Sequence, residues 1–406
     1  MKKLLIAALA IAVFVITACS SSGGGSGGSK TLTFMVIAPP ASPGNGNFPD
    51  GVNAAIDGFQ AKGGIPGYKI NVVWCNNGPF TTAVGTASGT AECGQKAVAD
   101  HAVAVTDFAS FDTEYPYLEK EGIPVIGDVP ESNGDWTNPL SYPLAGEPAS
   151  TYAGAGYGMA LNGCKRVALI GAGDASTLGR YMDAYQSGIK YGGGTFVGNV
   201  VWVAGTSDDL APAVATLDTY NPDCVGTLLT ATQLGPFITA VKDSGHPFVI
   251  SGNQSGFPPD TIKSLGAAAD GLEFTDDSLP DDWKTSGQAR MNAELSKYVP
   301  KAEIVVYTSQ MWAAAEVFTQ AAAAAAKTGA VTSKSVVAAL NKMSNVTTGV
   351  EPPGNFSKPG ALSFAPRVTV LQFAREKVVG DGQIVSIDKK LYDQAAPLVK
   401  YPVPGP

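Results

Sequence analysis

Side chains that commonly carry out chemistry are few and scattered in this sequence. Its two histidines, His101 and His246, lie far apart in the sequence, each without a nearby cysteine or second histidine. The sequence therefore offers few residues for a histidine-based zinc site or a histidine-activated nucleophile. No Gly-x-Ser-x-Gly elbow stands between a predicted strand and helix, and no His-Glu-x-x-His pattern is present. The carboxylate pairs Asp276-Asp277 and Asp281-Asp282 could hydrolyse a glycoside, but we expect them to be solvated or to cap a helix. We therefore predict no catalytic residue, no metal and no cofactor.

The start of the chain predicts export. Residues 1–18 combine Lys2 and Lys3 with an apolar run and small residues, as in a secretory signal peptide. The apolar run is shorter than the ~20 residues of a transmembrane helix, which makes a membrane anchor the weaker interpretation. Ile16-Thr17-Ala18-Cys19 resembles the lipobox of bacterial lipoproteins, in which cleavage precedes an acylated cysteine. We expect a lipid on Cys19 and a flexible Ser/Gly tether within residues 19–30.

The remaining cysteines are even in number. Cys75, Cys93, Cys164 and Cys224 would form two disulfides in an exported protein, although the sequence alone leaves three pairings open. A metal site made from all four is the alternative.

The composition is that of an ordinary globular protein. Apolar residues make up 45% and charged residues 15% of the chain, and the formal net charge is −8. Because no cluster of Lys and Arg occurs, nucleic-acid binding is excluded as a function class. The length beyond the tether exceeds what one hydrophobic core usually serves, so two domains or lobes are expected.

Short β-rich segments alternate with helical ones, which predicts parallel sheets with crossover helices. The first unit has strands predicted at 32–38, 68–74, 102–107 and 123–126, and helices near 50–62, 83–99 and 112–121. The second has strands at 166–171, 196–203, 224–230, 247–251 and 272–275, and helices near 150–162, 177–191, 207–219, 234–244 and 259–265. The tail has helices near 282–297, 308–327 and 332–343, then strands at 362–364, 368–374 and 383–388. It is too small for a third domain and is expected to complete both units.

Five segments together resemble the branched-chain amino-acid type of substrate-binding protein. Residues 59–74, FQAKGGIPGYKINVVW, are similar to the end of that family's first helix and its second strand. The others are EKEGIPVI at 119–126, CKRVALI at 164–170, AVKDSGHPFVISG at 240–252 and GALSF at 360–364. Ala365 stands where the family usually has Asp. The order and spacing agree over roughly residues 31–376.

The resemblance implies an α/β, two-lobed type I periplasmic-binding fold, each lobe a parallel sheet flanked by helices, with a hinge of several crossovers. The expected lobes are 31–146 plus 278–365 and 147–277 plus 366–406. The implied function is capture of a small molecule, amino acid-like or a neutral or aromatic carboxylate or amide, for an ABC permease. We expect a monomer, lipid-anchored to the outer face of the bacterial cytoplasmic membrane or periplasmic. Two such sheets that face each other across a hinge give a cleft that closes on a ligand.

The same resemblance implies the disulfide pairing. Cys164 and Cys224 stand just before strands that are neighbours in this fold, and Cys75 and Cys93 close a short loop. The ligand-binding residues are predicted where strands of either lobe end. They are Ser42, Asn47, Phe48, Ser110, Phe111, Asp128, Tyr152, Asp174, Thr177, Thr230, Gln233, Asn253 and Gln254.

Departures from the family pattern bear on the ligand. Gln254 stands where members that bind aliphatic amino acids carry an acid that meets the ligand's ammonium, and a neutral amide lacks that charge-assisted bond. Leu178 and Thr230 occupy positions where aromatic residues are common. A free α-amino acid is therefore in doubt unless another acid supplies the contact. Two other functions stay open: a sensor or receptor of the same fold, and an extracellular hydrolase.

Overall fold

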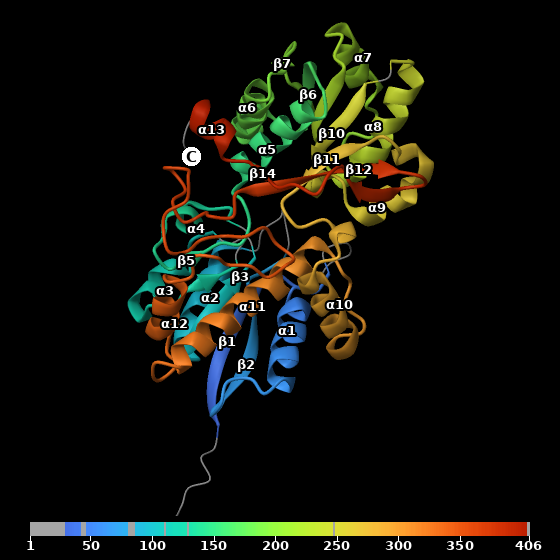
Figure 1. Cartoon of the computed structure of the whole chain (residues 1–406). Coiled ribbons are helices and arrows are strands. Elements are labelled where there is room, and N and C mark those ends of the chain that lie inside the picture. Colours follow the sequence, from blue (N-terminus) through green and yellow to red (C-terminus); the bar gives the residue numbers. More distant parts are fainter. Residues whose placement is uncertain are drawn as a thin grey trace, which may run out of the picture.

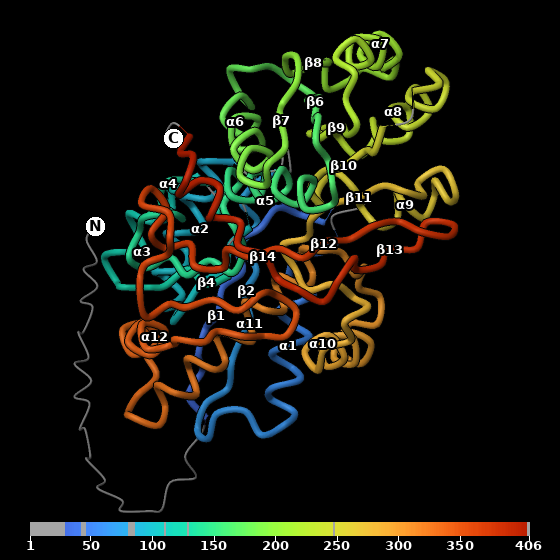
Figure 2. The backbone as a smooth tube through the Cα atoms, turned by 45° about the horizontal axis from the view of Figure 1, so that its top comes forward, coloured from blue at the N-terminus to red at the C-terminus, as the bar shows by residue number. Residues whose placement is uncertain are grey.

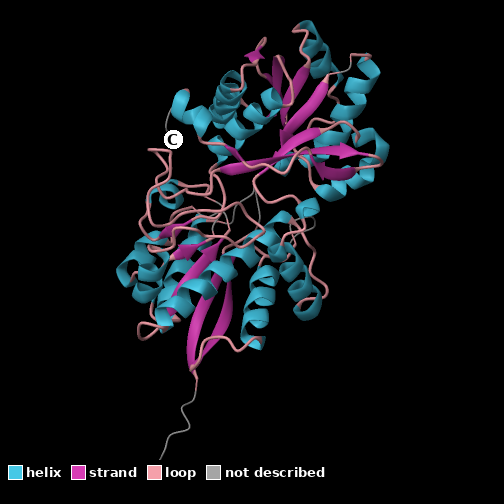
Figure 3. Cartoon of the chain, in the orientation of Figure 1, coloured by secondary structure: helices cyan, strands magenta, loops and turns pink. Residues whose placement is uncertain are grey.

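The computed structural model describes residues 29–41, 46–79, 86–108, 111–127, 130–246 and 248–403. Within these ranges the chain forms two α/β bodies, the first and the second lobe, each with its own β-sheet (Figures 1 and 3). The predicted signal peptide, Cys19 and nearly all of the tether lie outside the described residues. No helix in the described ranges is long and apolar enough to cross a membrane.

The first lobe is built on a five-stranded sheet in the order β2-β1-β3-β4-β5, with every neighbouring pair parallel. Its strands are β1 (Lys30–Ala38), β2 (Tyr68–Asn76), β3 (Ala102–Asp107), β4 (Val125–Ile126) and β5 (Ser141–Tyr142). Its helices are α1 (Pro49–Ala61), α2 (Ala87–Ala99), α3 (Tyr115–Glu121), α4 (Asn133–Thr137), α10 (Ser286–Tyr298), α11 (Val306–Ala326) and α12 (Ser333–Leu340).

Strand β1 explains why the first sheet is covered on both faces. Phe34 and Val36 pack into the core shared with α1 and α11, while Met35 and Ile37 pack into the core shared with α2 and α3. Successive side chains of a strand point to opposite faces, so a strand buried on both sides is an uninterrupted apolar run. This is why residues 34–38 lack the polar alternation of a half-exposed strand.

A buried carboxylate joins three helices of the first lobe. Glu294 on α10 accepts a hydrogen bond from the Trp312 indole of α11 at 2.9 Å and pairs with Lys62, next to α1, at 2.7 Å. Trp312 itself is fully buried, and Phe318 of the same helix stacks on Phe34 at 4.2 Å. A C-terminal segment thus forms part of the N-terminal core, and α11 crosses the sheet beside α1 (Figure 2).

The second lobe holds the larger sheet, in the order β13-β12-β11-β10-β9-β6-β7, with β8 beside β6 and β14 beside β12. Its strands are β6 (Arg166–Ala172), β7 (Thr195–Phe196), β8 (Val201–Val203), β9 (Cys224–Leu228), β10 (Val249–Asn253), β11 (Glu273–Asp276), β12 (Gln372–Val379), β13 (Gln383–Ser386) and β14 (Tyr392–Asp393). Its helices are α5 (Pro148–Leu161), α6 (Ala175–Tyr191), α7 (Ala211–Thr219), α8 (Ala231–Ser244), α9 (Pro259–Leu265) and α13 (Ala396–Lys400), with 3₁₀ turns η1 (Gln254–Gly256), η2 (Gly266–Ala269) and η3 (Asp281–Trp283).

The predicted two-lobed α/β fold is confirmed, with one difference in the second sheet. Strands β6 to β11 are parallel, but β12 runs antiparallel to β11, and β13 and β14 run antiparallel to β12. The sheet is mixed because the chain returns from the first lobe along its open edge and finishes there in a hairpin. Two expectations for strands were wrong: the predicted strand at 362–364 is absent, and the one at 196–203 is split into β7 and β8.

The chain passes between the lobes three times, from β5 to α5, from β11 to α10 and from α12 to β12. The three connections lie together between the lobes, as the tube in Figure 2 allows the reader to follow. Several parallel connections permit the lobes to rotate about one axis, which is the geometry of a hinge.

Both disulfides have the predicted pairing. Cys75 of β2 is bonded to Cys93 of α2, and Cys164, just before β6, is bonded to Cys224, the first residue of β9. Strands β6 and β9 are paired with Val167 opposite Cys224, which brings the two thiols of the second bond into range.

Candidate ligand-binding site

The carboxyl ends of strands in the second lobe face helix termini of the first lobe. A cavity of about 480 Å³ lies between them. Gln254 after β10 and Asp276 at the end of β11 line one side of it, and Gln288, Asn292 and Ser309 of α10 and α11 line the other. Ligands of open α/β sheets bind beyond the carboxyl ends of the strands, so this is the region to search for a binding site.

An aromatic wall stands on the first lobe beside this cavity. Phe48, just before α1, and Phe108, directly after β3, are buried, and their rings stack with centroids 4.4 Å apart. Tyr307, in the first turn of α11, meets Phe108 edge-on at 4.5 Å and remains partly exposed. The two phenylalanines therefore fix a tyrosine whose outer face is open.

A second aromatic group lies on the second lobe. Tyr152 of α5 lies 5.6 Å from Tyr181 and 6.1 Å from Tyr185, both on α6, measured between ring centroids. Tyr152 also shares a hydrogen bond with Ser255 after β10. Burial raises the pKa of the Tyr152 hydroxyl, and the Glu131 carboxylate adds to that rise. The hydroxyl is thus un-ionised at neutral pH and can donate a hydrogen bond.

Glu131 lies between the two aromatic groups. Its negative charge acts on the hydroxyls of Tyr152 and Tyr181 in the second lobe and of Tyr307 in the first. The residue as a whole is exposed, while the surrounding protein desolvates its carboxyl group. Desolvation by the surrounding protein raises the pKa of the Glu131 carboxyl to about 7, and the nearby Glu147 carboxylate contributes.

Further carboxyl groups gather at the hinge. Asp277 accepts a hydrogen bond from Thr151 at 2.6 Å, and burial raises its pKa to about 6. Asp276 and Glu376, on paired strands, are buried and share a hydrogen bond, which requires a proton on one of them. Burial also raises the pKa of Glu351, whose Oε2 atom has no hydrogen-bond partner among the described residues.

The expectation that the pair Asp276-Asp277 is solvated or caps a helix was therefore wrong for Asp276, while Asp277 is partly exposed. Asp276 is 7% exposed because β12 crosses back from the first lobe and pairs with β11, covering its end. That pairing joins residues about a hundred positions apart, so no local sequence pattern predicts it.

Four of the predicted ligand residues have structural roles at helix N-termini. Asp174 caps α6 by accepting hydrogen bonds from the backbone N–H groups of Ser176 and Thr177. The Ser176 hydroxyl, followed by these backbone groups, lowers the pKa of the Asp174 carboxyl. Thr230 and Gln233 form the capping box of α8. The Gln233 amide also donates to two backbone carbonyls, at 2.9 and 3.2 Å, which anchor the loop before α7. Ligand contact by these side chains stays a prediction.

The other predicted residues lie at different depths. Asn47 donates to Asp50 in the first turn of α1, Asn253 binds the Ser255 N–H at the end of β10, and Phe111 is exposed. Phe48, Tyr152 and Gln254 belong to the aromatic groups and the cavity described above. The predicted residues Ser42, Ser110 and Asp128 lie outside the described residues.

Sequence reasoning missed Glu131, Tyr181 and Tyr307. Glu131 comes five residues after the two-residue strand β4, and Tyr307 opens a helix assigned from sequence to the tail. Only the spacing of Tyr181 was informative, because it falls one turn into the helix after β6. The fold, rather than any motif, brings these side chains together.

Among the described residues, two groups of side chains have the ligand types of a metal site. Cys164 and Cys224 lie near Asp223, but their thiols are joined in a disulfide and cannot coordinate. Asp107, Glu114 and Asp135 bring carboxylate oxygens within 4.8 Å of one another. Asp135 accepts hydrogen bonds from Tyr115 and from Ser132 in the capping box of α4, so this member of the cluster has a structural role.

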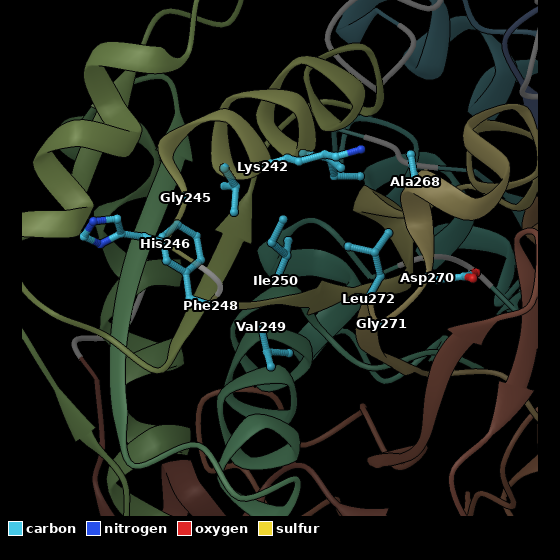
Figure 4. Close-up of a pocket in the computed structure, with 12 residues that line it drawn as sticks. Lys242, Gly245, His246, Phe248, Val249, Ile250, Ala268, Asp270, Gly271 and Leu272 are labelled. Carbon is cyan, nitrogen blue, oxygen red and sulfur yellow. The ribbon is translucent and has the colours of Figure 1, made fainter.

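An apolar hollow of about 540 Å³ lies at the opposite edge of the second sheet (Figure 4). It is lined by Phe248, Ile250 and Leu272, with His246 at its rim. These residues stand at the amino ends of β10 and β11, away from the hinge and from the first lobe. The hollow is therefore separate from the interlobe region.

Comparison with known proteins agrees with this architecture. Residues 37–372 match the family described as periplasmic binding protein. A branched-chain amino acid ABC transporter structure from Thermus thermophilus with bound valine superposes with a TM-score of 0.72 at 15% identity, covering 92% of this chain and 99% of that chain. A fatty acid ABC transporter substrate-binding protein from Thermomonospora curvata gives 0.69 at 15% identity, with coverages of 93% and 97%.

A solute-binding protein of R. palustris in complex with 4-hydroxybenzoate gives a TM-score of 0.67 at 15% identity, covering 90% of this chain and 98% of that chain. No curated protein sequence gives a significant match. The structural likenesses establish a common fold and leave the ligand open. The family match covers most of the sequence, the two lobes and three crossings have the arrangement expected from it, and the chain belongs to the periplasmic binding protein family with the type I fold.

Proposed function

We propose that the protein is an extracytoplasmic solute-binding lipoprotein that captures a small molecule between its lobes and delivers it to an ABC permease. The lipid would be attached to Cys19 and hold the protein at the outer face of the cytoplasmic membrane. The proposed lobes are residues 31–146 with 278–365, and 147–277 with 366–406. In favour of these bounds, β11 ends at Asp276, and β12 joins the second sheet at Gln372.

One observation carries the proposal: side chains of both lobes converge on the same interlobe space. Gln254 and Asp276 come from the second lobe, Asn292 and Ser309 come from the first, and all four line one cavity. A ligand placed there would contact both lobes at once and would favour their closed arrangement. A permease that recognises the closed arrangement would distinguish loaded from empty protein.

The sequence and the structurally similar proteins together suggest a range of ligand classes to be tested. It includes amino acid-like compounds and neutral or aromatic carboxylates and amides. The structures from Thermus thermophilus and R. palustris bind valine and 4-hydroxybenzoate, which lie within this range. We expect no catalysis and a monomeric protein.

A thermal-shift screen tests the proposed function. The protein would be the chain from Ser29 on, which contains every described element of both lobes. A ligand at 100 times its dissociation constant stabilises a protein by ~2.7 kcal/mol, which a melting curve detects. We expect a saturable shift with one chemical class and its reduction in Tyr152→Ala, with no reduction in the control Val399→Ala, at an exposed position of α13. Catalytic turnover of a bound compound would contradict the proposal.

A further inference from the structure

A buried apolar cluster joins the two lobes beside the first and third crossings. It includes Trp136 of α4 in the first lobe, Ala153 of α5 and Ala184 of α6 in the second lobe, and Leu362 and Val368 of the third crossing, each at most 4% exposed. Between β11 and α11, by contrast, the lobes are separated by the cavity of about 480 Å³. The lobes therefore share a core at this cluster, and contacts made here can fix their relative orientation.

One charged side chain enters this cluster from the second lobe. Arg180, in the second turn of α6, places its guanidinium carbon 5.4 Å from the ring centroid of Trp136 and 5.1 Å from that of Phe364. The two rings meet edge-on with centroids 6.4 Å apart. The face of an aromatic ring attracts a cation, and the attraction is strongest where water is excluded. Trp136 is buried and Arg180 is partly buried, which favours a strong contact.

Both rings are attached to the first lobe. The Trp136 indole donates a hydrogen bond to the Pro130 carbonyl at 2.6 Å. Arg367, three residues after Phe364, donates from its backbone N–H to the Trp136 carbonyl at 2.9 Å and from its side chain to the Ser141 carbonyl of β5 at 2.8 Å. The third crossing is thus hydrogen-bonded to α4 and β5. Both rings therefore move with the first lobe, whereas the guanidinium of α6 moves with the second.

The contact lies close to the connections about which the lobes turn. Strand β5 ends at Tyr142 and α5 begins at Pro148, so the first crossing is short, and Phe364 lies on the third crossing itself. Points near the axis of a rotation are displaced little, so the lobes can open and close while the guanidinium stays on the two rings. A slide or twist of one lobe against the other would pull it off them. Arg180 is therefore placed to permit hinge rotation and to oppose other movements.

The same helix carries part of the aromatic group of the second lobe. Tyr181 follows Arg180 directly, and its ring centroid lies 5.6 Å from that of Tyr152 on α5. A displacement of α6 against α4 would move these rings relative to the first lobe. The orientation of α6 thus affects the interlobe space in which a ligand is proposed to bind.

We propose that Arg180 is a positioning residue, which holds α6 against Trp136 and Phe364 and so confines the movement of the second lobe to rotation about the hinge. These three side chains form the Arg180 clamp. The inference goes beyond the proposed function, because it concerns the path of lobe movement and holds for a ligand of any class.

Loss of the clamp should weaken ligand binding through the fraction of molecules that are oriented to bind. The apparent dissociation constant rises as the inverse of that fraction. A variant in which about a third to a tenth of the molecules keep the competent orientation would therefore bind about threefold to tenfold more weakly.

Measurement of interlobe distances by electron paramagnetic resonance tests the clamp without a ligand. Spin labels would be attached to the chain from Ser29 on through Glu92→Cys on α2 and Asp243→Cys on α8, at exposed positions of the first and second lobes. The four cysteines already in this part of the chain form two disulfides and are not labelled.

Two variants break the clamp from opposite lobes. Arg180→Gln removes the cation, and Phe364→Leu removes a ring at a partly exposed position while retaining an apolar side chain. The two changes would also be combined. Arg290→Gln is the matched control, because Arg290 stacks over Trp312 at 4.9 Å entirely within the first lobe.

We expect one narrow distribution of interlobe distances in the parent chain and in Arg290→Gln, and a broader one in Arg180→Gln and in Phe364→Leu. The combined variant should be no broader than Arg180→Gln alone, because each change breaks the same contact. Arg180→Gln should also weaken binding of the best compound from the thermal-shift screen by about threefold to tenfold.

A distribution in Arg180→Gln as narrow as that of the parent would overturn the inference. So would broadening that adds up in the combined variant, or unchanged ligand affinity in Arg180→Gln. Because the distances are measured without a ligand, an absence of binding in the thermal-shift screen would count against the proposed function alone.

Discussion

Removal of the disulfide between Cys164 and Cys224 is predicted to destabilise the protein without affecting ligand binding. The bond joins the amino ends of β6 and β9, two adjacent strands of the second sheet. The ligand is proposed to lie beyond the opposite, carboxyl ends of these strands. The double variant Cys164→Ala with Cys224→Ala removes the crosslink and places a small apolar side chain at two buried positions.

The size of the effect follows from the length of chain that the bond closes. The two cysteines are separated by 60 positions, and the loss of loop-closure entropy for such a loop corresponds to ~4 kcal/mol of stability. The bond between Cys75 and Cys93 closes only 18 positions, for which the same relation gives ~3 kcal/mol. Removal of the bond between Cys164 and Cys224 should therefore lower the free energy of unfolding by about 1 kcal/mol more than removal of the bond between Cys75 and Cys93.

Equilibrium urea unfolding of both double variants, each compared with the parent chain, measures the two free energies. Calorimetric titration of the best ligand from the screen gives the affinity in parallel. A larger loss for Cys75→Ala with Cys93→Ala would refute the loop-length reasoning. A large loss of affinity in Cys164→Ala with Cys224→Ala, at concentrations of urea where the variant is folded, would refute the separation of the bond from the site.

Three further predictions concern packing and ionisation. Glu294→Ala should cost about 1–3 kcal/mol in urea unfolding, because it leaves the buried Trp312 indole N–H without an acceptor, whereas the exposed Lys62 ammonium returns to water. Glu294→Gln, which retains an acceptor for the indole, should cost less. Gly188→Ala would place a methyl group 2.0 Å from a backbone oxygen of α5, so it should lower the free energy of unfolding by about 1–3 kcal/mol. The clash should also shift α5 and weaken ligand binding. Unchanged ligand affinity in this variant would contradict the prediction. Burial raises the folded-state pKa of the carboxyl pair Asp276 and Glu376, so the melting temperature should fall as pH rises from 5 to 9. Glu376→Gln should make that fall smaller. An unchanged dependence of melting temperature on pH in this variant would count against a proton shared by the two carboxyl groups.

The fold and the disulfides could be predicted from sequence because both depend on local signals repeated along the chain. Alternating strands and helices predict a parallel sheet, and five segments between residues 59 and 364 together resemble one family, which implies the strand order. The pairing of Cys164 with Cys224 follows once that order is known. The mixed edge of the second sheet depends on β12, which pairs with β11 across about a hundred residues.

The site was predicted less completely, for two physical reasons. Polar residues after a strand can cap the next helix or face a ligand, and Asp174 and Thr230 are engaged in capping. Glu131 follows a strand of only two residues, and it faces Tyr152 because the connection from β5 to α5 places the second lobe above it. Its importance depends on the arrangement of the lobes, which no short sequence pattern encodes.

Whether a ligand is held between the lobes is tested most directly by a crystal structure with the compound that gives the largest thermal shift. We predict that the compound lies between Tyr152 and Tyr307 and contacts residues of both lobes. A compound bound at the apolar hollow beside His246, or one that contacts a single lobe, would contradict the proposed site.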